Sequence, residues 1–305
     1  MLMDAFVIIA TKGRAEESCR LLLSLSNQTI KPKGVIFVGT EPADLEGLKE
    51  APAFAEIDCR LYIADRAGSS VQRNIGLNRA LADWAQSGPW FAAFFDDDFR
   101  PADDWLEQVR NVFLAEENVV GVTGQVIADG IHGAGISEDE AVAYLEGRLP
   151  PRRSWAQGNA PRLVSSVYGC NMAFRNVVAR EVRFDEQLPL YAWQEDRDYT
   201  GQAGAYGDVI YHPAPKGVHL GVKRGRTSGV RMGYSQIANP IYLMRKGTMQ
   251  ARHCWRFLWR AVVANMVKSI RNDPYVDYRG RLSGNIAALT SMIKGKLHPS
   301  RILDL

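Results

Sequence analysis

Short apolar runs alternate with segments of helical periodicity through the first half of the chain, and this order restricts the folds that the sequence can adopt. Runs such as WFAAFF at residues 90–95 are typical of parallel strands that are buried on both faces. The sequence therefore predicts an α/β fold, with a mixed, mostly parallel central sheet flanked by helices. The strands are expected at residues 6–10, 35–39, 61–64, 90–95 and 119–123, and the helices at about 15–27, at about 71–85 and after Pro101.

Length and composition fit one large domain with an appendage. The 305 residues are 46% hydrophobic, which is enough for a full core. We expect the main domain over residues 1–245 and a helical extension over residues 246–305. Between the expected strands, residues 128–162 mix Gly, Pro and charged side chains. This stretch is expected to be irregular and is a candidate lid over an active site.

The termini and the cysteines favour a cytoplasmic protein. The four cysteines, Cys19, Cys59, Cys170 and Cys254, are scattered without a CxxC spacing, so neither a disulfide framework nor a zinc site is expected. The first residues lack a basic segment before their short apolar run, and they resemble a buried strand more than a signal peptide. No stretch approaches the roughly 20 apolar residues of a membrane-spanning helix.

The C-terminal extension is basic and amphipathic. The net charge of the chain is +3, whereas residues 251–305 carry ten Lys and Arg against three Asp. Aromatic and aliphatic residues alternate with the basic ones over residues 252–271. Two interpretations remain open: the helices pack on the main domain, or they make a peripheral contact with the anionic inner face of a membrane. Nucleic acid is not an expected partner, because no recognised nucleic-acid motif accompanies the basic residues.

Three consecutive carboxylates, Asp96, Asp97 and Asp98, directly follow the apolar run at 90–95. Ligands of open α/β sheets collect outside the carboxyl ends of strands. Adjacent carboxylates at such a position raise one another's pKa unless a cation shares the site. Mg²⁺ and Mn²⁺ bind carboxylates together with substrate phosphates, so a divalent metal with a diphosphate ligand is expected. An acidic turn that caps the following helix would leave the same pattern.

Seven segments, in sequence order, resemble motifs of glycosyltransferase family 2, which comprises inverting enzymes of the GT-A fold. They span residues 6–219 and lie at 10–14 (ATKGR), 26–29 (SNQT), 68–76 (GSSVQRNIG), 94–106 (FFDDDFRPADDWL), 169–175 (GCNMAFR), 184–186 (FDE) and 193–198 (WQEDRD). The resemblance implies a GT-A catalytic domain over 1–245, with a nucleotide-sugar-binding half at 1–125 and an acceptor-binding half at 126–245. The extension is similar to those of bacterial members that build surface polysaccharides.

The resemblance also implies a reaction and a site. The reaction is inverting transfer of a sugar from a nucleotide-diphosphate donor to a hydroxyl of a glycan or lipid-linked acceptor. Asp196 is the expected general base, with Glu195 as its alternative or its orienting neighbour, and Asp98 and His219 are the expected ligands of Mg²⁺ or Mn²⁺. The expected donor contacts are Thr11, Arg14, Thr40, Arg73, Asp96 and Asp97, and the expected acceptor contacts are Asn171 and Trp193.

One departure and two alternatives remain. Many relatives have Asp-Asp-Gly-Ser after the second strand, where this chain has VGTEP at 38–42, so Thr40 or Glu41 would have to contact the nucleotide base. A sugar-phosphate nucleotidyltransferase could use the same fold, but it would need a Gly-rich basic loop after the first strand, and Gly13-Arg14 matches that poorly. A non-catalytic sugar- or lipid-binding scaffold is disfavoured by the intact Asp98 and Asp196.

Overall fold

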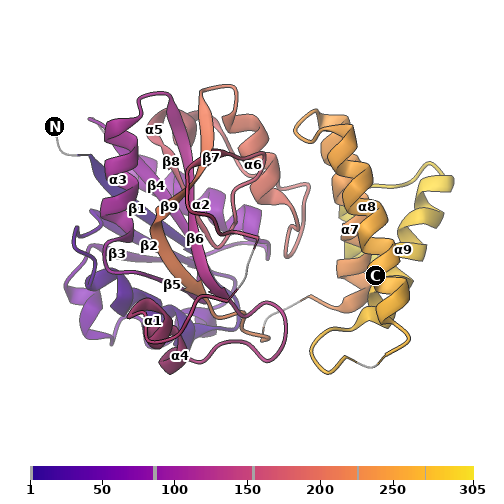
Figure 1. Cartoon of the computed structure of the whole chain (residues 1–305), viewed down its shortest axis with the longest axis horizontal. Helices are drawn as coiled ribbons and strands as arrows, with labels where there is room; N and C mark the ends of the chain where they lie inside the picture. The colour runs from indigo at the N-terminus through magenta and orange to yellow at the C-terminus, as the bar shows by residue number, and fades with distance from the viewer. Residues whose placement is uncertain (1–2, 85–87, 153–154, 225–226, 272) are drawn as a thin grey trace.

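A mixed β-sheet runs through the N-terminal two thirds of the protein (Figure 1). The computed structural model describes residues 3–84, 88–152, 155–224, 227–271 and 273–305. Within them the sheet has nine strands in the order β3-β2-β1-β4-β8-β6-β9-β5, with β7 paired to β9. The strands are β1 (Asp4–Ala10), β2 (Gly34–Gly39), β3 (Cys59–Ile63), β4 (Trp90–Asp96), β5 (Phe99–Pro101), β6 (Val119–Asp129), β7 (Arg162–Leu163), β8 (Asn171–Arg175) and β9 (Asp208–His219).

The sheet changes character at β8. Strands β1 to β4 are mutually parallel, as the apolar runs predicted, and every residue of β4 except Asp96 is buried. Strand β8 is antiparallel to both β4 and β6, and β6 is parallel to β9. As a result β1, β4, β6 and β9 all point the same way. The short β5 contains Pro101, which has no amide hydrogen to donate, and it lies at the end of the strand order.

Helices cover both faces of the sheet, as expected. The first face packs against α1 (Ala15–Ser26) and α3 (Trp105–Ala115). The second packs against α2 (Ser69–Asp83), α5 (Asn176–Glu181) and α6 (Glu195–Ala203). Gly76 lets α2 approach β1, since a Cβ there would lie 2.5 Å from Cγ2 of Ile8. Short 3₁₀ helices occupy Pro42–Leu45 and Pro52–Ala55 after β2.

The stretch 128–162 is less irregular than the sequence analysis expected. Strand β6 extends to Asp129, and helix α4 spans Glu138–Leu145. Ser137 begins this helix with a capping box, in which its hydroxyl accepts a hydrogen bond from the amide of Glu140 and the Glu140 carboxylate bonds back to Ser137. The Ser-x-x-Glu spacing is typical of a helix N-terminus, so this helix was indicated by a local motif, whereas the composition of the stretch indicated irregular structure. Residues 153–154 of the predicted lid lie outside the described residues.

Three long helices form the C-terminal part, which lies beside the α/β body in Figure 1. They are α7 (Gly229–Lys246), α8 (Ala251–Lys268) and α9 (Tyr278–Ile293), followed by a 3₁₀ helix at Pro299–Asp304. Their shared core includes Ile237, Cys254 and Ala288. Because α7 packs with α8 and α9, the helical part begins at Gly229, upstream of the boundary placed at residue 246. Within the described residues, no helix is long and apolar enough to cross a membrane.

A buried polar joint connects the helices to the α/β body. Asp198 on α6 is fully buried, and its carboxylate accepts hydrogen bonds from Nζ of Lys246 at 2.7 Å and from Oγ1 of Thr248 at 2.6 Å. The same ammonium group lies 2.6 Å from Oδ2 of Asp185, which also accepts a hydrogen bond from Tyr242. One cation is thus shared by two carboxylates, and the polar groups at this junction are compensated.

Helices α7 and α9 cross with their backbones in contact. A Cβ at Gly284 would lie 2.0 Å from the carbonyl oxygen of Val230, and one at Gly233 would lie 2.0 Å from the carbonyl oxygen of Arg281. Neither position can accept a side chain unless the two helices separate.

We expect Gly284→Ala to lower the stability of the protein. Alanine is favoured over glycine in a helix by about 1 kcal/mol, but the clash with Val230 should outweigh this gain, since overpacking typically costs about 1–3 kcal/mol. Urea unfolding measures the difference. The neighbouring Ser283→Ala, at an exposed position of the same helix, is the control and should be neutral or slightly stabilising. A Gly284→Ala protein at least as stable as wild type would show that the helices do not touch at this point.

Candidate active site

Polar side chains gather where four strands end at the same edge of the sheet. Thr11 follows β1, Asp96 ends β4, Asp129 ends β6 and His219 ends β9. Since these strands point the same way, their carboxyl ends bring together residues that are far apart in the sequence. The turn between β4 and β5 adds Asp97 and Asp98, which are both almost fully buried.

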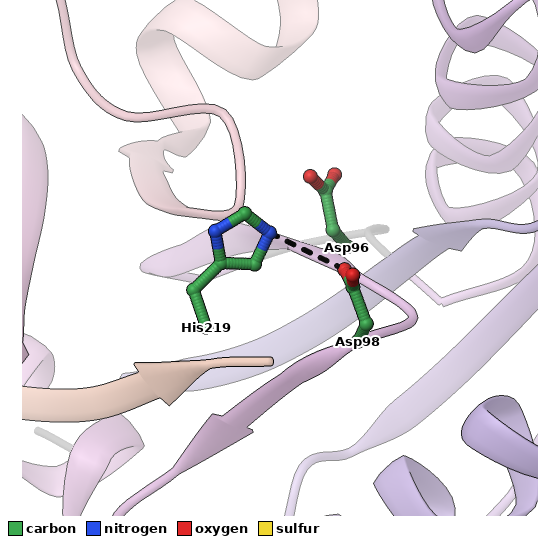
Figure 2. A group of neighbouring side chains, drawn as sticks. All are labelled: Asp96, Asp98 and His219. Carbon is green, nitrogen blue, oxygen red and sulfur yellow. Dashed lines mark ion pairs between the residues drawn. The ribbon is translucent and has the colours of Figure 1, made fainter. Parts of the chain in front are cut away.

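Asp96, Asp98 and His219 form a compact group of potential metal ligands (Figure 2). One ligand atom from each residue lies within 4.8 Å of the others, and Nε2 of His219 is 3.4 Å from Oδ1 of Asp98. Two ligands at right angles around a metal, each about 2.1 Å from it, would be roughly 3 Å apart. The spacing of Asp98 and His219 is therefore close to that of neighbouring ligands.

The hydrogen bonds of Asp98 leave one oxygen free for a cation. Its Oδ2 accepts a hydrogen bond from the amide of Val222 at 2.8 Å, whereas its buried Oδ1 has no hydrogen-bond partner. A buried carboxylate oxygen without a partner is costly unless a cation lies beside it. Asp96 also remains partly exposed, so a ligand can reach the group from solvent. The residues present therefore fit Mg²⁺ or Mn²⁺, both of which accept such oxygen and nitrogen ligands.

His219 is oriented by a second group of residues that the sequence analysis did not identify. Its Nδ1 lies 3.0 Å from Oδ1 of Asp129 and 3.2 Å from the hydroxyl of Tyr168, which itself donates a hydrogen bond to Asp129. When Nδ1 is protonated and donates its hydrogen bond to Asp129, the imidazole ring is held with Nε2 toward Asp98. Burial lowers the pKa of His219, but the carboxylates of Asp98 and Asp129 outweigh it and raise that pKa to about 10. In the absence of a metal, a proton on this imidazole balances the two carboxylates.

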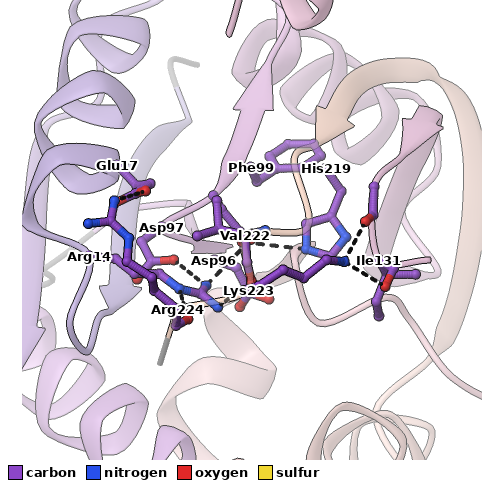
Figure 3. A network of polar contacts seen from close by, with 12 residues as sticks. Arg14, Glu17, Asp96, Asp97, Phe99, Ile131, His219, Val222, Lys223 and Arg224 are labelled. Atoms are coloured by element: carbon purple, nitrogen blue, oxygen red, sulfur yellow. Dashed lines mark hydrogen bonds and ion pairs between the residues drawn. The ribbon is translucent and has the colours of Figure 1, made fainter. Parts of the chain in front are cut away.

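Asp97 belongs to a different network, in which Arg14 is the central cation (Figure 3). Nη1 of Arg14 lies 2.8 Å from Oδ1 of Asp97 and 3.4 Å from Oδ2 of Asp98, and the hydroxyl of Thr11 donates to Oδ2 of Asp97 at 2.8 Å. Arg14 also donates to the carbonyl oxygens of Val222 and Arg224. The predicted donor contacts Thr11, Arg14 and Asp97 thus lie together, and Arg14 fixes the segment after β9 against the acidic turn.

The predicted base lies at the start of α6. Glu195 and Asp196 occupy its first turn, where the helix dipole favours negative charge. Oδ2 of Asp196 accepts a hydrogen bond from the amide of Gly169 at 3.1 Å, and Oδ1 accepts one from the amide of Arg197 at 2.7 Å. Burial raises the pKa of Asp196 above its usual value, although Arg197 opposes this effect. Burial likewise raises the pKa of Glu195, against the opposing charge of Arg73.

The backbone before α6 is in an unusual conformation. Leu190, Ala192 and Gln194 all have positive φ, at 59°, 50° and 77°. Non-glycine residues in this region cost about 1–3 kcal/mol each, and such residues cluster at functional sites. The segment also carries Tyr191, whose hydroxyl has a raised pKa because of burial and, to a smaller extent, the negative charges of Asp96 and Glu195.

Arg73 connects the two halves of the site. Its guanidinium group is 3% exposed and forms ion pairs with Asp96 at 2.8 Å and with Glu195. It also donates to the carbonyl oxygen of Gly169, whose amide bonds to Asp196. A contact between Arg73 and the donor remains a prediction, because these protein groups occupy both of its terminal nitrogens.

Thr40 is held by a carboxylate that the sequence analysis overlooked. Oδ2 of the fully buried Asp44 accepts hydrogen bonds from the amide and hydroxyl of Thr40 and from the amide of Glu41, while Oδ1 accepts one from Gly13 at 2.6 Å. Burial works to raise the pKa of Asp44, but these hydrogen bonds hold it below its usual value. Asp44 thus ties the turn after β2 to the turn after β1, and the hydroxyl of Thr40 is already engaged.

The two predicted acceptor contacts lie in different surroundings. Asn171 is fully buried, and its Oδ1 accepts a hydrogen bond from the amide of Gly124 at 2.6 Å. Its buried Nδ2 has no hydrogen-bond partner among the described residues, and a contact with the acceptor remains a prediction. Trp193 is partly exposed, and its ring meets that of Phe257 on α8 edge-on at 6.2 Å between centroids. Trp193 therefore lies where the segment before α6 meets the C-terminal helices.

Comparison with solved structures identifies the fold. S. aureus TarS residues 1–349 with UDP has a TM-score of 0.54 and 15% identity, covering 88% of this chain and 72% of TarS. GalNAc-T7 with UDP, GalNAc and Mn²⁺ has a TM-score of 0.59 and 14% identity, covering 96% of this chain and 57% of that one. A mannosyltransferase from Pyrobaculum calidifontis, in complex with GDP-Man and Mn²⁺, has a TM-score of 0.53 and 17% identity, covering 98% and 84%.

These neighbours share the GT-A fold, which confirms the predicted fold class. The chain spans 44% of a longer TarS structure that it also matches. A search among curated proteins finds no match. The family model described as Glycosyl transferase family 2 matches residues 6–183, which is more than half of the chain. The protein therefore belongs to glycosyl transferase family 2, and the prediction of a glycosyltransferase enzyme is confirmed.

Proposed function

We propose that this chain transfers a sugar, with inversion at the anomeric carbon, from a nucleotide-diphosphate donor to a hydroxyl of a glycan or lipid-linked acceptor. The observation that carries the proposal is the bridge through Arg73, which pairs with Asp96 on one side and with Glu195, the neighbour of Asp196, on the other. A group of metal-ligating residues and a candidate base thus face one reaction centre, which is the arrangement that displacement of a nucleoside diphosphate by a hydroxyl requires.

Donor binding is assigned to the edge formed by β1, β4 and β9. Asp98 and His219 would hold the divalent metal together with Asp96, and a bound metal would neutralise charge that develops on the leaving diphosphate. Arg14, Thr11 and Asp97 would position the nucleotide part from the adjacent network. Three of the solved neighbours support this assignment, since their crystals contain UDP, UDP with Mn²⁺, or GDP-Man with Mn²⁺.

Proton removal from the acceptor hydroxyl is assigned to Asp196. The amides of Gly169 and Arg197 hold its carboxylate in place. Burial keeps its pKa above the usual value, which makes it a stronger base than an exposed aspartate. Glu195, which is paired with Arg73, orients the site beside it.

The two other candidate functions are separated by the product released from a panel of nucleotide sugars with Mn²⁺. Release of nucleoside diphosphate indicates glycosyl transfer, release of pyrophosphate indicates nucleotidyl transfer, and release of neither favours a binding scaffold. Membership of glycosyl transferase family 2 supports the first outcome.

We also propose that the protein is cytoplasmic and contacts the membrane peripherally through α8. One face of this helix packs on the protein core through Cys254 and Leu258, but a second face leaves apolar side chains in solvent. That face is flanked by arginines and carries Trp255, Trp259 and Met266, which are 53–69% exposed. Tryptophans beside arginines suit the interface of an anionic bilayer.

The first prediction concerns the metal. A nucleoside diphosphate with Mn²⁺ at 100 times its dissociation constant should stabilise the wild type by about 2.7 kcal/mol. Asp98→Asn and Asp98→Ala should abolish this stabilisation, because both remove the charged carboxylate that would bind the metal. Thermal unfolding with and without Mn²⁺ measures it. Asp139→Ala, which removes an exposed carboxylate of α4, is the control. Undiminished stabilisation of both Asp98 variants would contradict the metal assignment.

The second prediction concerns the base. Asp196→Asn should reduce transfer by about 10²–10⁴ while nucleoside diphosphate binding is retained. Because burial raises the pKa of Asp196, the wild-type rate should fall with decreasing pH at values where an exposed aspartate would still be ionised. Initial rates across pH and binding by calorimetry provide the two readouts.

The matched variant for this prediction is Glu195→Gln, which removes the neighbouring carboxylate. If Glu195 only orients the site, this variant should lose less activity than Asp196→Asn and should retain the fall in rate at low pH. Near-normal turnover in Asp196→Asn together with inactivity of Glu195→Gln would move the base to Glu195.

The third prediction concerns the membrane. Trp255→Ala combined with Trp259→Ala should reduce co-sedimentation with anionic phosphatidylglycerol vesicles, since both rings would leave the interface. The control is Leu114→Ala, which removes an apolar side chain of comparable exposure from α3 on the α/β body. Equal vesicle binding by the wild type and the tryptophan variant would exclude this face as the contact.

A further inference from the structure

A cationic pocket lies between the α/β body and helix α8, outside the group of carboxylates. Its walls are formed by Ser165 and Arg197 on one side and by His253, Arg256, Phe257 and Arg260 on the other. Its volume is about 230 Å³, which corresponds to the liquid volume of roughly seven water molecules. The pocket thus has room for a small anionic group such as a phosphate or a diphosphate.

Arg256 and Arg260 of this pocket have no ion-pair partner among the described residues, whereas the charge of Arg197 interacts with the adjacent carboxylate of Asp196. Within the described residues, His253 also forms no ion pair. Arg197 is only 8% exposed, and its side-chain hydrogen bonds go to neutral partners, Oε1 of Gln194 and the oxygens of Ser165. Burial and the nearby Arg197 and Arg256 lower the pKa of His253. Gathering several positive groups around a pocket is unfavourable unless an anion shares it.

The geometry of the walls suits a phosphate group. Three arginines present planar groups of donors that match phosphate oxygens, and charge-assisted hydrogen bonds of this kind are among the strongest in proteins. His253 lies in the first turn of the 18-residue helix α8, so the positive end of the helix dipole is on the same side. The ring of Phe257 forms a cation–π contact with Arg197, with 5.0 Å between the guanidinium carbon and the ring centroid, and this contact holds the arginine side chain in place.

The position of the pocket assigns the phosphate to the acceptor. Arg197 directly follows Asp196 in the sequence, and its amide donates a hydrogen bond to that carboxylate. Phe257, on the opposite wall, contacts the ring of Trp193. The diphosphate of the donor is expected instead at Asp96, Asp98 and His219, on the other side of Arg73 and Glu195.

We infer that this pocket binds a phosphate or diphosphate group of the acceptor while the acceptor hydroxyl lies at Asp196. The inference rests on the proposed transfer function and narrows its acceptor to a phosphorylated molecule. The same group can be carried by a water-soluble molecule or by a lipid headgroup. Since α8 carries both the pocket residues and the exposed tryptophans, a phosphorylated lipid could reach the pocket from the bilayer surface.

The test uses inorganic pyrophosphate with the full-length protein in EDTA, so that no divalent metal can hold the anion at the carboxylates. Calorimetry should show binding by the wild type, and the double variant Arg256→Gln, Arg260→Gln should bind at least about tenfold more weakly because two charge-assisted contacts are lost. The matched control is Arg245→Gln with Arg271→Gln, which removes two positive charges from exposed residues that do not line the pocket. Absence of binding by the wild type, or equal weakening in both double variants, would overturn the inference.

A second arm distinguishes the source of the phosphate. Phosphatidylcholine vesicles with and without phosphatidic acid present the group on a lipid. A difference between the pocket and control variants on the phosphatidic acid vesicles indicates a lipid-borne phosphate, and a difference with soluble pyrophosphate alone indicates a soluble acceptor. Either result supports the pocket, whereas no difference in either arm contradicts it.

The proposed function is monitored separately through the donor. Stabilisation by a nucleoside diphosphate with Mn²⁺ should be unchanged in Arg256→Gln, Arg260→Gln, because neither residue belongs to the metal or nucleotide networks. Loss of pyrophosphate binding with intact donor binding is the result that supports the inference. Absence of donor binding in every protein, the wild type included, would instead count against the transfer function.

Discussion

Compensation of buried charge is the constraint on which the rest of this structure depends. The strands of the sheet bring carboxylates to one edge, and burial there disfavours the ionised forms of Asp97, Asp98 and Asp129. Cationic side chains of the same chain compensate these charges. Arg14 forms ion pairs with Asp97 and Asp98, and Arg73 forms ion pairs with Asp96 and Glu195. Protonated His219 forms ion pairs with Asp98 and Asp129. Oδ1 of Asp98 accepts no hydrogen bond among the described residues, and it lies beside the imidazole of His219.

The same principle operates at two other places in the molecule, with different outcomes. At the junction with the C-terminal helices, Lys246 lies between Asp185 and Asp198, and the charges are satisfied internally. At the pocket beside α8, Arg256 and Arg260 have no carboxylate partner in the part of the chain that the structure describes. A cluster of charges that are paired within the protein stabilises the fold, whereas a cluster without oppositely charged partners needs a ligand to compensate it. This contrast separates the structural ion pairs of the chain from its candidate binding sites.

Periodicity predicted the parallel strands β1 to β4, because buried strands are continuous apolar runs. The resemblance predicted that Asp98 and His219 lie together, whereas it gave Asp96 a contact with the donor. The partners of these residues were not predictable. Asp129 and Tyr168 reach His219 from a strand that extends beyond its apolar run and from a loop, and Asp44 joins two turns that are distant in sequence. Each depends on tertiary packing, for which a single sequence has no local pattern. Helix α4 is different, since its capping box was legible at Ser137 and Glu140.

The C-terminal helices support the segment before α6, in which Leu190, Ala192 and Gln194 have positive φ. Leu188 and Ala192 are buried in the core that these helices build, and Asn239 of α7 donates a hydrogen bond to the carbonyl oxygen of Trp193. The unfavourable backbone torsions that aim Asp196 are therefore maintained from outside the nucleotide-binding fold. The helices support the conformation of the segment before α6, so replacing them would also shift the backbone that precedes Glu195 and Asp196.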